Sequence, residues 1–253
     1  MNELDSAKIV LKKIKENGFL AYFVGGFVRD YIMGIDNNDI DITTNATKDD
    51  LQKIFDKVIP TGEKFEGVTI IYNDYKFEVT TFRTDLFYGD HRHPDVRIAK
   101  TLEEDLARRD FTINALACDE AFNIIDKYDG RKDIENKIIR AVGDSSKRFV
   151  EDALRIMRAF YFSAKLNFDI DSITLKGIDE ASIYLENVSG ERIYRELLKM
   201  FNTKYLLKGL KYMSSSKAIL HLPSLKESTN ILLKYHHKVD FIEYLALSFY
   251  LEG

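Results

Sequence analysis

Two carboxylates that lie two residues apart form the strongest chemical feature of this sequence. Asp39 and Asp41 alternate with isoleucines, and this alternation predicts a strand that buries one face. Because side chains at positions i and i+2 of a strand point the same way, the two carboxylates project together. They repel one another unless a cation lies between them, and Mg²⁺ is a hard cation that prefers oxygen ligands. The spacing predicts a metal site, although Asp-x-Asp alone is usually solvated surface.

A glycine turn lies upstream of these carboxylates. Gly25 and Gly26 follow an apolar segment, residues 20–24, and precede a helical pattern that carries Arg29. In a strand–turn–helix of this kind, backbone N–H groups can approach a phosphate with no side chain in the way. Gly25, Gly26 and Arg29 are therefore expected to face the phosphates of a nucleoside triphosphate, whereas Gly-Gly alone is usually only a turn.

A third carboxylate lies in a predicted hairpin. Residues 67–72 and 75–82 alternate in polarity around a short polar turn. Glu78 lies on the second strand, opposite its apolar neighbours. If this strand lies beside Asp39 and Asp41, Glu78 is able to assist deprotonation of an attacking hydroxyl. Otherwise it is an exposed strand glutamate.

The segment 151–158 combines a carboxylate with guanidinium groups at helical spacing. On one continuous helix over residues 144–166, Asp152, Arg155 and Arg158 share a face. The simplest interpretation is an intrahelical salt bridge of little energetic weight. The alternative is a base template, because cytosine and adenine both present an amine beside an unprotonated ring nitrogen. A carboxylate that accepts from the amine and a guanidinium that donates to the nitrogen fit these bases and mismatch uracil and guanine.

These segments, together with Arg108-Arg109-Asp110-Phe111-Thr112-Ile113-Asn114-Ala115, resemble in their order the class II tRNA nucleotidyltransferase and bacterial poly(A) polymerase family. The resemblance covers residues 19–168, with a weaker similarity at residues 189–198. It implies an α+β fold, in which a polymerase-β-type nucleotidyltransferase head with a mixed sheet is followed by a helical neck and body.

The resemblance also implies roles for particular residues. Asp39 and Asp41 would bind two Mg²⁺ ions, and Asp152 with Arg155 would select the base. The incoming nucleotide's sugar and phosphates would be contacted by Arg109, Asp110 and Asn114, with Arg158 as a further triphosphate contact. Arg108 receives no role.

The implied reaction is transfer of CMP and AMP from CTP and ATP to the 3′ end of tRNA. Poly(A) addition and addition of A alone are alternatives within the family. Residues 85–94 resemble the flexible loop of members that add A, which favours A addition, although a polar surface loop is the simpler interpretation. Outside the family, the alternatives are a small-molecule nucleotidyltransferase, against which the base template argues, and a silent RNA-binding module, against which the intact carboxylates argue.

Composition limits these possibilities. The chain has 253 residues, a formal net charge of −4 and one cysteine, Cys118, so no intramolecular disulfide can form. It shows no signal-peptide core and no membrane-spanning apolar run, and we expect a cytoplasmic protein without a membrane partner. The pattern predicts a catalytic head over residues 1–138, a helical neck over 139–200 and a short helical region over 201–253.

Any RNA contact must come from local positive charge, because the chain is acidic overall. Basic residues gather after residue 190, where the alternative is a solvated helix face. The candidate RNA-binding residues are Arg192, Arg195, Lys199, Lys204, Lys208 and Lys211. Because familiar members of the family are longer, a tRNA grip that differs from theirs, and a homodimer, are expectations that stay open.

Overall fold

The computed structural model describes residues 1–61, 67–86, 95–235 and 239–252. They form two compact units, of which the first ends at Glu135 and the second begins at Asn136. We call them the head unit and the helical unit. The predicted division at residues 138 and 200 stays a prediction.

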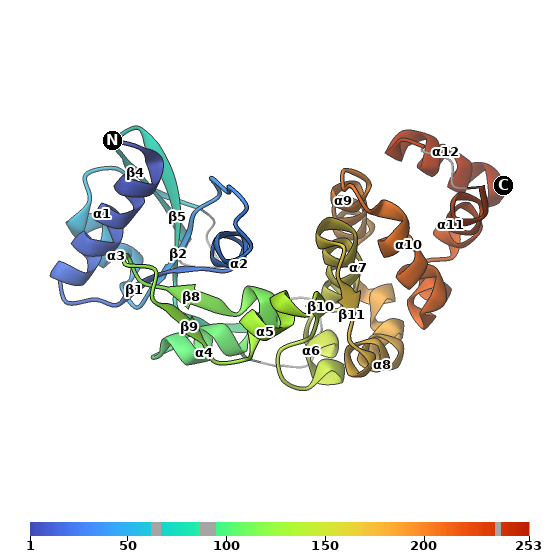
Figure 1. The fold of residues 1–253 in the computed structure, drawn as a ribbon, viewed down its shortest axis with the longest axis horizontal. Coiled ribbons are helices and arrows are strands. Elements are labelled where there is room, and N and C mark those ends of the chain that lie inside the picture. The colour runs from blue at the N-terminus through green and yellow to red at the C-terminus, as the bar shows by residue number, and fades with distance from the viewer. Residues whose placement is uncertain (62–66, 87–94, 236–238, 253) are drawn as a thin grey trace. The chain divides into compact units, whose positions relative to one another are not determined.

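A seven-stranded sheet forms the centre of the described head unit, in the order β3-β4-β5-β2-β1-β8-β9 (Figure 1). Its ladders are antiparallel except that of β2 with β5, which is parallel. The sheet strands are β1 (Ala21–Val24), β2 (Asp41–Thr44), β3 (Val58–Pro60), β4 (Gly67–Tyr72), β5 (Tyr75–Thr81), β8 (Leu116–Cys118) and β9 (Ile124–Asp126). A separate ladder joins β6 (Arg83–Leu86) to β7 (Asp95–Ile98), and the predicted flexible loop between them lies largely outside the described residues.

Three of the described helices of the head unit begin at a side-chain cap, provided by Asn2, Thr47 and Thr101. The helices of this unit are α1 (Glu3–Glu16), α2 (Gly26–Ile32), α3 (Lys48–Ile54), α4 (Leu102–Ala107) and α5 (Gly130–Glu135). Thr47 and Asp50 form a complete capping box on α3. On α4 only half of such a box forms, because Thr101 caps the helix while Glu104 accepts from the backbone N–H of Lys100.

The predicted hairpin of β4 and β5 is confirmed. Its turn residues Asn73 and Asp74 both have positive φ, of 50° and 65°, as in the turns that match the twist of a two-residue hairpin. Phe77 and Val79 on β5 are fully buried, so Glu78 projects from the other face. The register of this strand follows from its alternation, since a slip by one residue would expose the phenylalanine.

In the described residues of the helical unit, one short parallel ladder, β10 (Ile138–Ile139) with β11 (Asp169–Ile170), accompanies the helices (Figure 1). The helices are α6 (Ser145–Glu151), α7 (Leu154–Leu166), α8 (Ser172–Ala181), α9 (Gly190–Phe201), α10 (Leu206–Ser215), α11 (Pro223–Tyr235) and α12 (Phe241–Glu252). A Cβ at Gly209 of α10 would lie 2.6 Å from the carbonyl oxygen of Phe160, so α10 packs closely on α7 at this point.

The prediction of a single helix over residues 144–166 is wrong. The helix is interrupted at Asp152, whose φ of −150° and ψ of 100° are those of extended backbone. The Asp152 carboxylate accepts the backbone N–H of Leu154 at the start of α7, and this cap competes with a continuous helix. Further along the chain, α8 ends at Ala181 and the next residues continue as a 3₁₀ helix, Ser182–Asn187.

The α+β fold class is therefore confirmed, with a mixed sheet followed by helices. Within the described ranges, no helix combines the length and the apolar character needed to cross a membrane.

Candidate active site

The carboxylates predicted from the sequence meet at the edge where β2 begins. Asp41 is the first residue of β2, and the parallel ladder pairs it with Glu78 of β5. Asp39 is exposed and precedes the strand, so the strand begins two residues later than predicted. The alternation still holds, because Ile40 and Ile42 are both buried.

The electrostatics of Asp41 reflect this crowding of negative charge. Burial, reinforced by the charges of Asp39 and Glu78, raises the pKa of Asp41 to about 6, against an opposing effect of Arg109. A cation bound there would lower the free energy of the ionised form, so the donor set suits a hard divalent ion. Among the described residues, no group of three or more His, Cys, Asp or Glu side chains is close enough to enclose a metal alone.

The glycine turn lies under the guanidinium group of Arg109. Gly25 caps α2 with φ 69° and ψ −131°, a backbone conformation that favours glycine. A Cβ at Gly25 would lie 2.9 Å from Nη1 of Arg109 and 3.9 Å from Oδ2 of Asp41. Turn, guanidinium and carboxylate therefore lie close together, and a side chain at position 25 would collide with Arg109.

Asp105 holds this arginine, and the sequence analysis missed it. Its side chain is fully buried and accepts from Nη2 of Arg109 at 3.2 Å and from Nε and Nη2 of Arg108. Burial raises the pKa of the Asp105 carboxyl, but the two arginines outweigh it and hold that pKa below its usual range. The spacing of Asp105 from both arginines is the i,i+3 and i,i+4 signal of a helix, and it could have indicated this role.

Arg29, Asp110 and Asn114 form a buried group. Arg29 is only 2% exposed, and its Nη1 donates to Oδ1 of Asn114 at 2.6 Å. Asn114 in turn donates from Nδ2 to Oδ1 of Asp110 at 3.0 Å. The structure brings these three predicted nucleotide contacts together, and their contact with a nucleotide stays a prediction.

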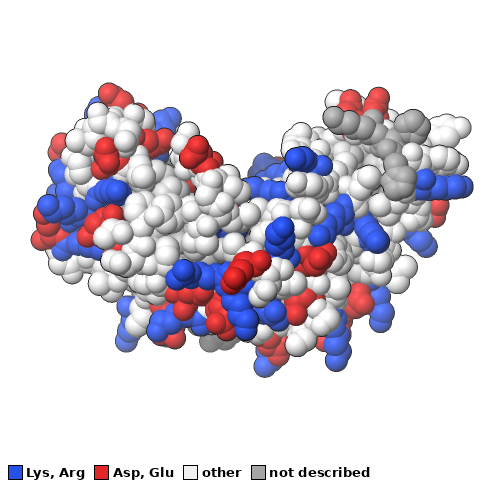
Figure 2. Space-filling model, viewed as in Figure 1, with Lys and Arg blue, Asp and Glu red and all other residues white. Residues whose placement is uncertain are grey.

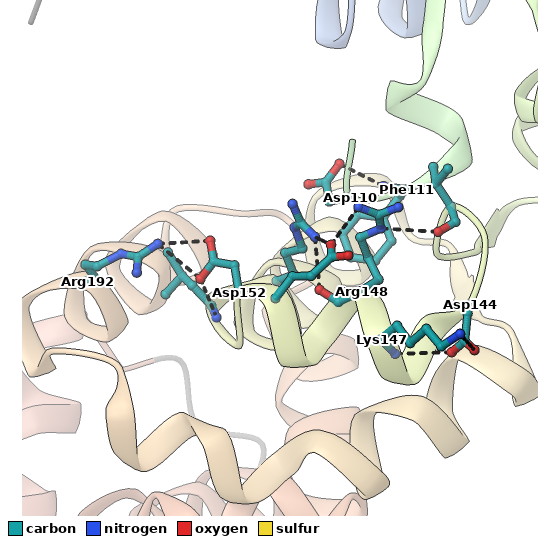
Figure 3. A network of polar contacts seen from close by, with 11 residues as sticks. Asp110, Phe111, Asp144, Lys147, Arg148, Asp152 and Arg192 are labelled. Carbon is teal, nitrogen blue, oxygen red and sulfur yellow. Dashed lines mark hydrogen bonds and ion pairs between the residues drawn. The ribbon is translucent and has the colours of Figure 1, made fainter. Parts of the chain in front are cut away.

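In the helical unit, Asp152 and Arg155 have separate partners. Oδ2 of Asp152 accepts from Nη2 of Arg192 at 3.0 Å (Figure 3). Arg155 lies in the first turn of α7, where its Nη1 donates to the carboxylate of Glu151 and to the carbonyl oxygen of Arg148. The guanidinium of Arg158 lies 5.3 Å from the ring centre of Phe162.

Most of the predicted RNA-binding cations are paired with carboxylates. Besides the Arg192 pair, the ion pairs are Arg195–Glu191, Lys199–Glu196 and Lys208–Asp169. Lys204 lies 5.4 Å from the ring centre of Tyr205, and Lys211 is exposed. Figure 2 shows Lys and Arg interspersed with Asp and Glu over the surface in that view. Four of these six cations would therefore have to exchange partners before they could contact RNA.

Two family profiles match the chain. One is described as the poly(A) polymerase head domain and matches residues 21–140. The other is described as a probable RNA- and SrmB-binding site of polymerase A and matches residues 167–229. The fold and these matches together identify the chain as a member of the tRNA nucleotidyltransferase and poly(A) polymerase family.

Individual relatives within that family have more specific names. The chain is 45% identical over 230 residues to a CCA-adding enzyme of Streptococcus mutans, which covers 90% of this chain and 57% of that protein. It is 44% identical to a CCA-adding enzyme of Staphylococcus aureus, over 87% of this chain and 55% of that protein. The chain thus spans little more than half the length of these relatives.

Solved structures show the same similarity. A CCA-adding enzyme of Bacillus stearothermophilus in complex with CTP superposes with a TM-score of 0.84 at 36% identity, over 93% of this chain and 58% of that one. A Thermotoga maritima CCA-adding enzyme complexed with tRNA superposes with a TM-score of 0.69 at 28% identity, over 90% of this chain and 55% of that one.

Proposed function

We propose that this chain transfers CMP and AMP from CTP and ATP to the 3′ hydroxyl of tRNA, in addition or repair of the CCA end. The observation that carries the proposal is the arrangement of Asp39, Asp41 and Glu78 beside the Gly25 turn and Arg109. Similarity to CCA-adding enzymes seen with CTP and with tRNA supports the choice of substrates.

Asp39 and Asp41 would hold two Mg²⁺ ions. When bound, such ions make an attacking hydroxyl more acidic and neutralise the charge that develops on a triphosphate. The chain's own groups would orient the substrate. Gly25 leaves room for Arg109, and Arg109 presents to the triphosphate donors whose orientation Asp105 fixes.

Glu78 would act on the attacking hydroxyl. It is exposed on β5 beside Asp41, and it is therefore placed to accept a proton at the start of the reaction. The 3′ hydroxyl oxygen would attack the α-phosphate in line with the leaving group. The new phosphate ester would form as the bond to pyrophosphate breaks, and pyrophosphate would be released.

Base choice would belong to Asp152 and Arg155 in the helical unit. Because Asp152 is paired with Arg192 and Arg155 with Glu151, base recognition requires these side chains to exchange partners. We propose that the nucleotide base takes the place of Arg192 and Glu151. Its amine would then donate to the Asp152 carboxylate, and its ring nitrogen would accept from the Arg155 guanidinium. Arg158 would assist at the triphosphate.

The test is incorporation with defined substrates. The protein is incubated with tRNA that lacks the CCA end, with each nucleoside triphosphate supplied separately, and with an unrelated RNA as control. We expect incorporation from CTP, and from ATP only after CC is present, and none on the unrelated RNA. Incorporation of ATP alone into any RNA would establish poly(A) addition. Incorporation of A onto tRNA that already ends in CC, with no incorporation from CTP onto tRNA that lacks the CCA end, would establish addition of A alone.

A further inference from the structure

A chain of hydrogen bonds connects the two ends of the candidate site inside the head unit. From Asp110 and Asn114 it passes through Arg29 to Asp30, whose Oδ1 accepts from Nε of Arg29 at 2.8 Å. Oδ2 of Asp30 accepts from Nδ2 of Asn37 at 2.8 Å. Oδ1 of Asn37 accepts the backbone N–H of Asp39, also at 2.8 Å. A buried charge pair is thereby joined to the main chain of a proposed metal ligand.

The middle of this series of hydrogen bonds is held in place by burial and by an ion pair. Arg29 and Asp30 are 2% and 5% exposed, and both lie on the short helix α2 that begins at the glycine turn. A buried guanidinium that bonds a carboxylate is costly to separate, because either charge would be left unpaired. Asp30 therefore offers Asn37 a fixed acceptor.

The orientation of Asn37 follows from its two partners. Asp30 is an acceptor only, so the amide nitrogen of Asn37 must face it. The amide oxygen then faces Asp39, where it accepts a main-chain N–H that no strand ladder uses, since β2 begins at Asp41. Among the described residues, Asn37 is the one partner of the Asp39 amide, and Asp39 is otherwise exposed.

We propose that Asn37 is a positioning residue that holds Asp39 in the metal-binding geometry, with the Asp30–Arg29 pair as its support. This inference rests on the proposed role of Asp39 as a metal ligand. It assigns to the buried arginine of the glycine-turn helix the task of linking the carboxylates to Asn114 and Asp110. Asn37 is neither a ligand nor a catalytic residue, and it acts only through the main chain of Asp39.

The first measurement addresses the contact itself. Hydrogen–deuterium exchange at the Asp39 amide is compared in wild type, Asn37→Ala and Asn38→Ala. Asn38 is an exposed neighbour of the same type and serves as the matched control. We expect exchange about fivefold faster in Asn37→Ala, the factor that corresponds to one ordinary hydrogen bond, and wild-type exchange in Asn38→Ala. Equal exchange in all three proteins would overturn the inference.

The second measurement addresses the consequence. Mn²⁺, a paramagnetic substitute for Mg²⁺, is titrated into each folded protein and its binding is followed by electron paramagnetic resonance without nucleotide. Loss of a group that orients a metal ligand commonly weakens metal binding about 10- to 100-fold, and we expect the lower end for Asn37→Ala because it acts through the backbone. Asn38→Ala should bind Mn²⁺ as wild type does. Incorporation kinetics at saturating Mg²⁺ should then recover toward wild type in Asn37→Ala.

The two measurements separate this inference from the proposed function. If wild type incorporates CMP and binds Mn²⁺, and Asn37→Ala binds Mn²⁺ equally well, the positioning role is wrong and the proposed function stands. If wild type binds no Mn²⁺ and incorporates nothing, the proposed function fails, and the positioning role fails with it.

Discussion

The predicted metal ligands of the head unit and the predicted base-selecting residues of the helical unit carry their charges in opposite arrangements. In the head unit, Asp39, Asp41 and Glu78 bring like charges together, and the pKa of Asp41 rises to about 6. In the helical unit, Asp152 and Arg155 are each paired with an opposite charge. A bound cation would relieve the repulsion among the three carboxylates, whereas Asp152 and Arg155 already have partners of opposite charge. We infer that the head unit is prepared for metal and triphosphate, and that the helical unit must give up existing contacts before it recognises a base.

The largest effect is expected from removing one of the neighbouring carboxylates of the head unit. Changing either Asp39 or Asp41 to Ala should reduce incorporation by about 10³-fold, because a catalytic metal contributes several kcal/mol and about 1.4 kcal/mol is a factor of ten. The melting temperature without metal should not fall, since one repelling charge is removed. Asp49→Ala, an exposed carboxylate on α3, is the control. Near wild-type turnover in either variant would rule out the site.

The glycine turn offers the next test, with a matched control in the same unit. Gly25 and Gly34 both have positive φ, of 69° and 67°, but only Gly25 has Arg109 against its Cβ position. Both alanine variants should lose about 1–3 kcal/mol of stability through backbone strain. Only Gly25→Ala should also raise the KM for CTP and ATP, by about tenfold or more, because it displaces a charged hydrogen-bond donor worth roughly 1.5–3 kcal/mol.

The turn hypothesis depends on that difference between the two glycines. Steady-state kinetics with both triphosphates and thermal unfolding of each variant provide the measurements. Equal kinetic damage in Gly25→Ala and Gly34→Ala would show that backbone strain, rather than the position of Arg109, is responsible.

The paired charges of the helical unit predict a change in specificity. Asp152→Ala or Arg155→Ala should weaken discrimination against UTP and GTP by about 1–3 kcal/mol, the usual cost of a lost bidentate base contact. Arg192→Ala should also alter base choice, since it removes the present partner of Asp152. Arg195→Ala, whose partner is the exposed Glu191, is the control. Strict preference for CTP and ATP in the Asp152 and Arg155 variants would make their ion pairs purely structural.

Protons and a metal ion would compete for the Asp41 carboxylate of the head unit. Because the pKa of Asp41 is raised, the metal-free fold favours its protonated form, and that stabilising contribution is lost as pH rises through about 6. A metal requires the ionised form, so Mn²⁺ affinity should rise up to about tenfold per pH unit below pH 6 and level off above it. Titrations between pH 5 and pH 8 measure this, and affinity that does not change with pH would contradict it.

The smallest expected effect concerns tRNA. Lys204 and Lys211 are exposed, whereas Lys208 is paired with Asp169. Changing Lys204 and Lys211 together to Ala should weaken tRNA binding and reduce the slope of log affinity against log salt by about one to two, if each contacts one phosphate. Lys208→Ala should change the slope less. An unchanged slope in the double variant would place the tRNA contact elsewhere.

Local patterns predicted much of the head unit. The carboxylate pair, the glycine turn and the β4–β5 hairpin all follow from alternation, spacing and turn residues within short stretches of the chain. The pairing of Asp41 with Glu78 was left open, because parallel register between distant strands leaves no local signal in the sequence.

The helical unit was predicted less well for a related reason. Helical periodicity continues through Asp152, and nothing in that period shows that its carboxylate caps the next helix and interrupts the first. Asn37 was missed because its bond to Asp30 forms only in three dimensions, whereas Asp105 was missed although its spacing from Arg108 and Arg109 was a local signal. Their residue types alone suit a solvated surface.

The parallel pairing of β2 with β5 has a consequence for how the protein folds. The β4–β5 hairpin closes over a two-residue turn and can form within microseconds, whereas β2 and β5 join positions 37 residues apart and must await loop closure. That later step brings Glu78 against Asp41, so electrostatic repulsion opposes it at neutral pH. We expect Mg²⁺ or moderate salt to accelerate refolding of the head unit. The same charges that prepare the site for its metal would then slow its assembly until a cation arrives.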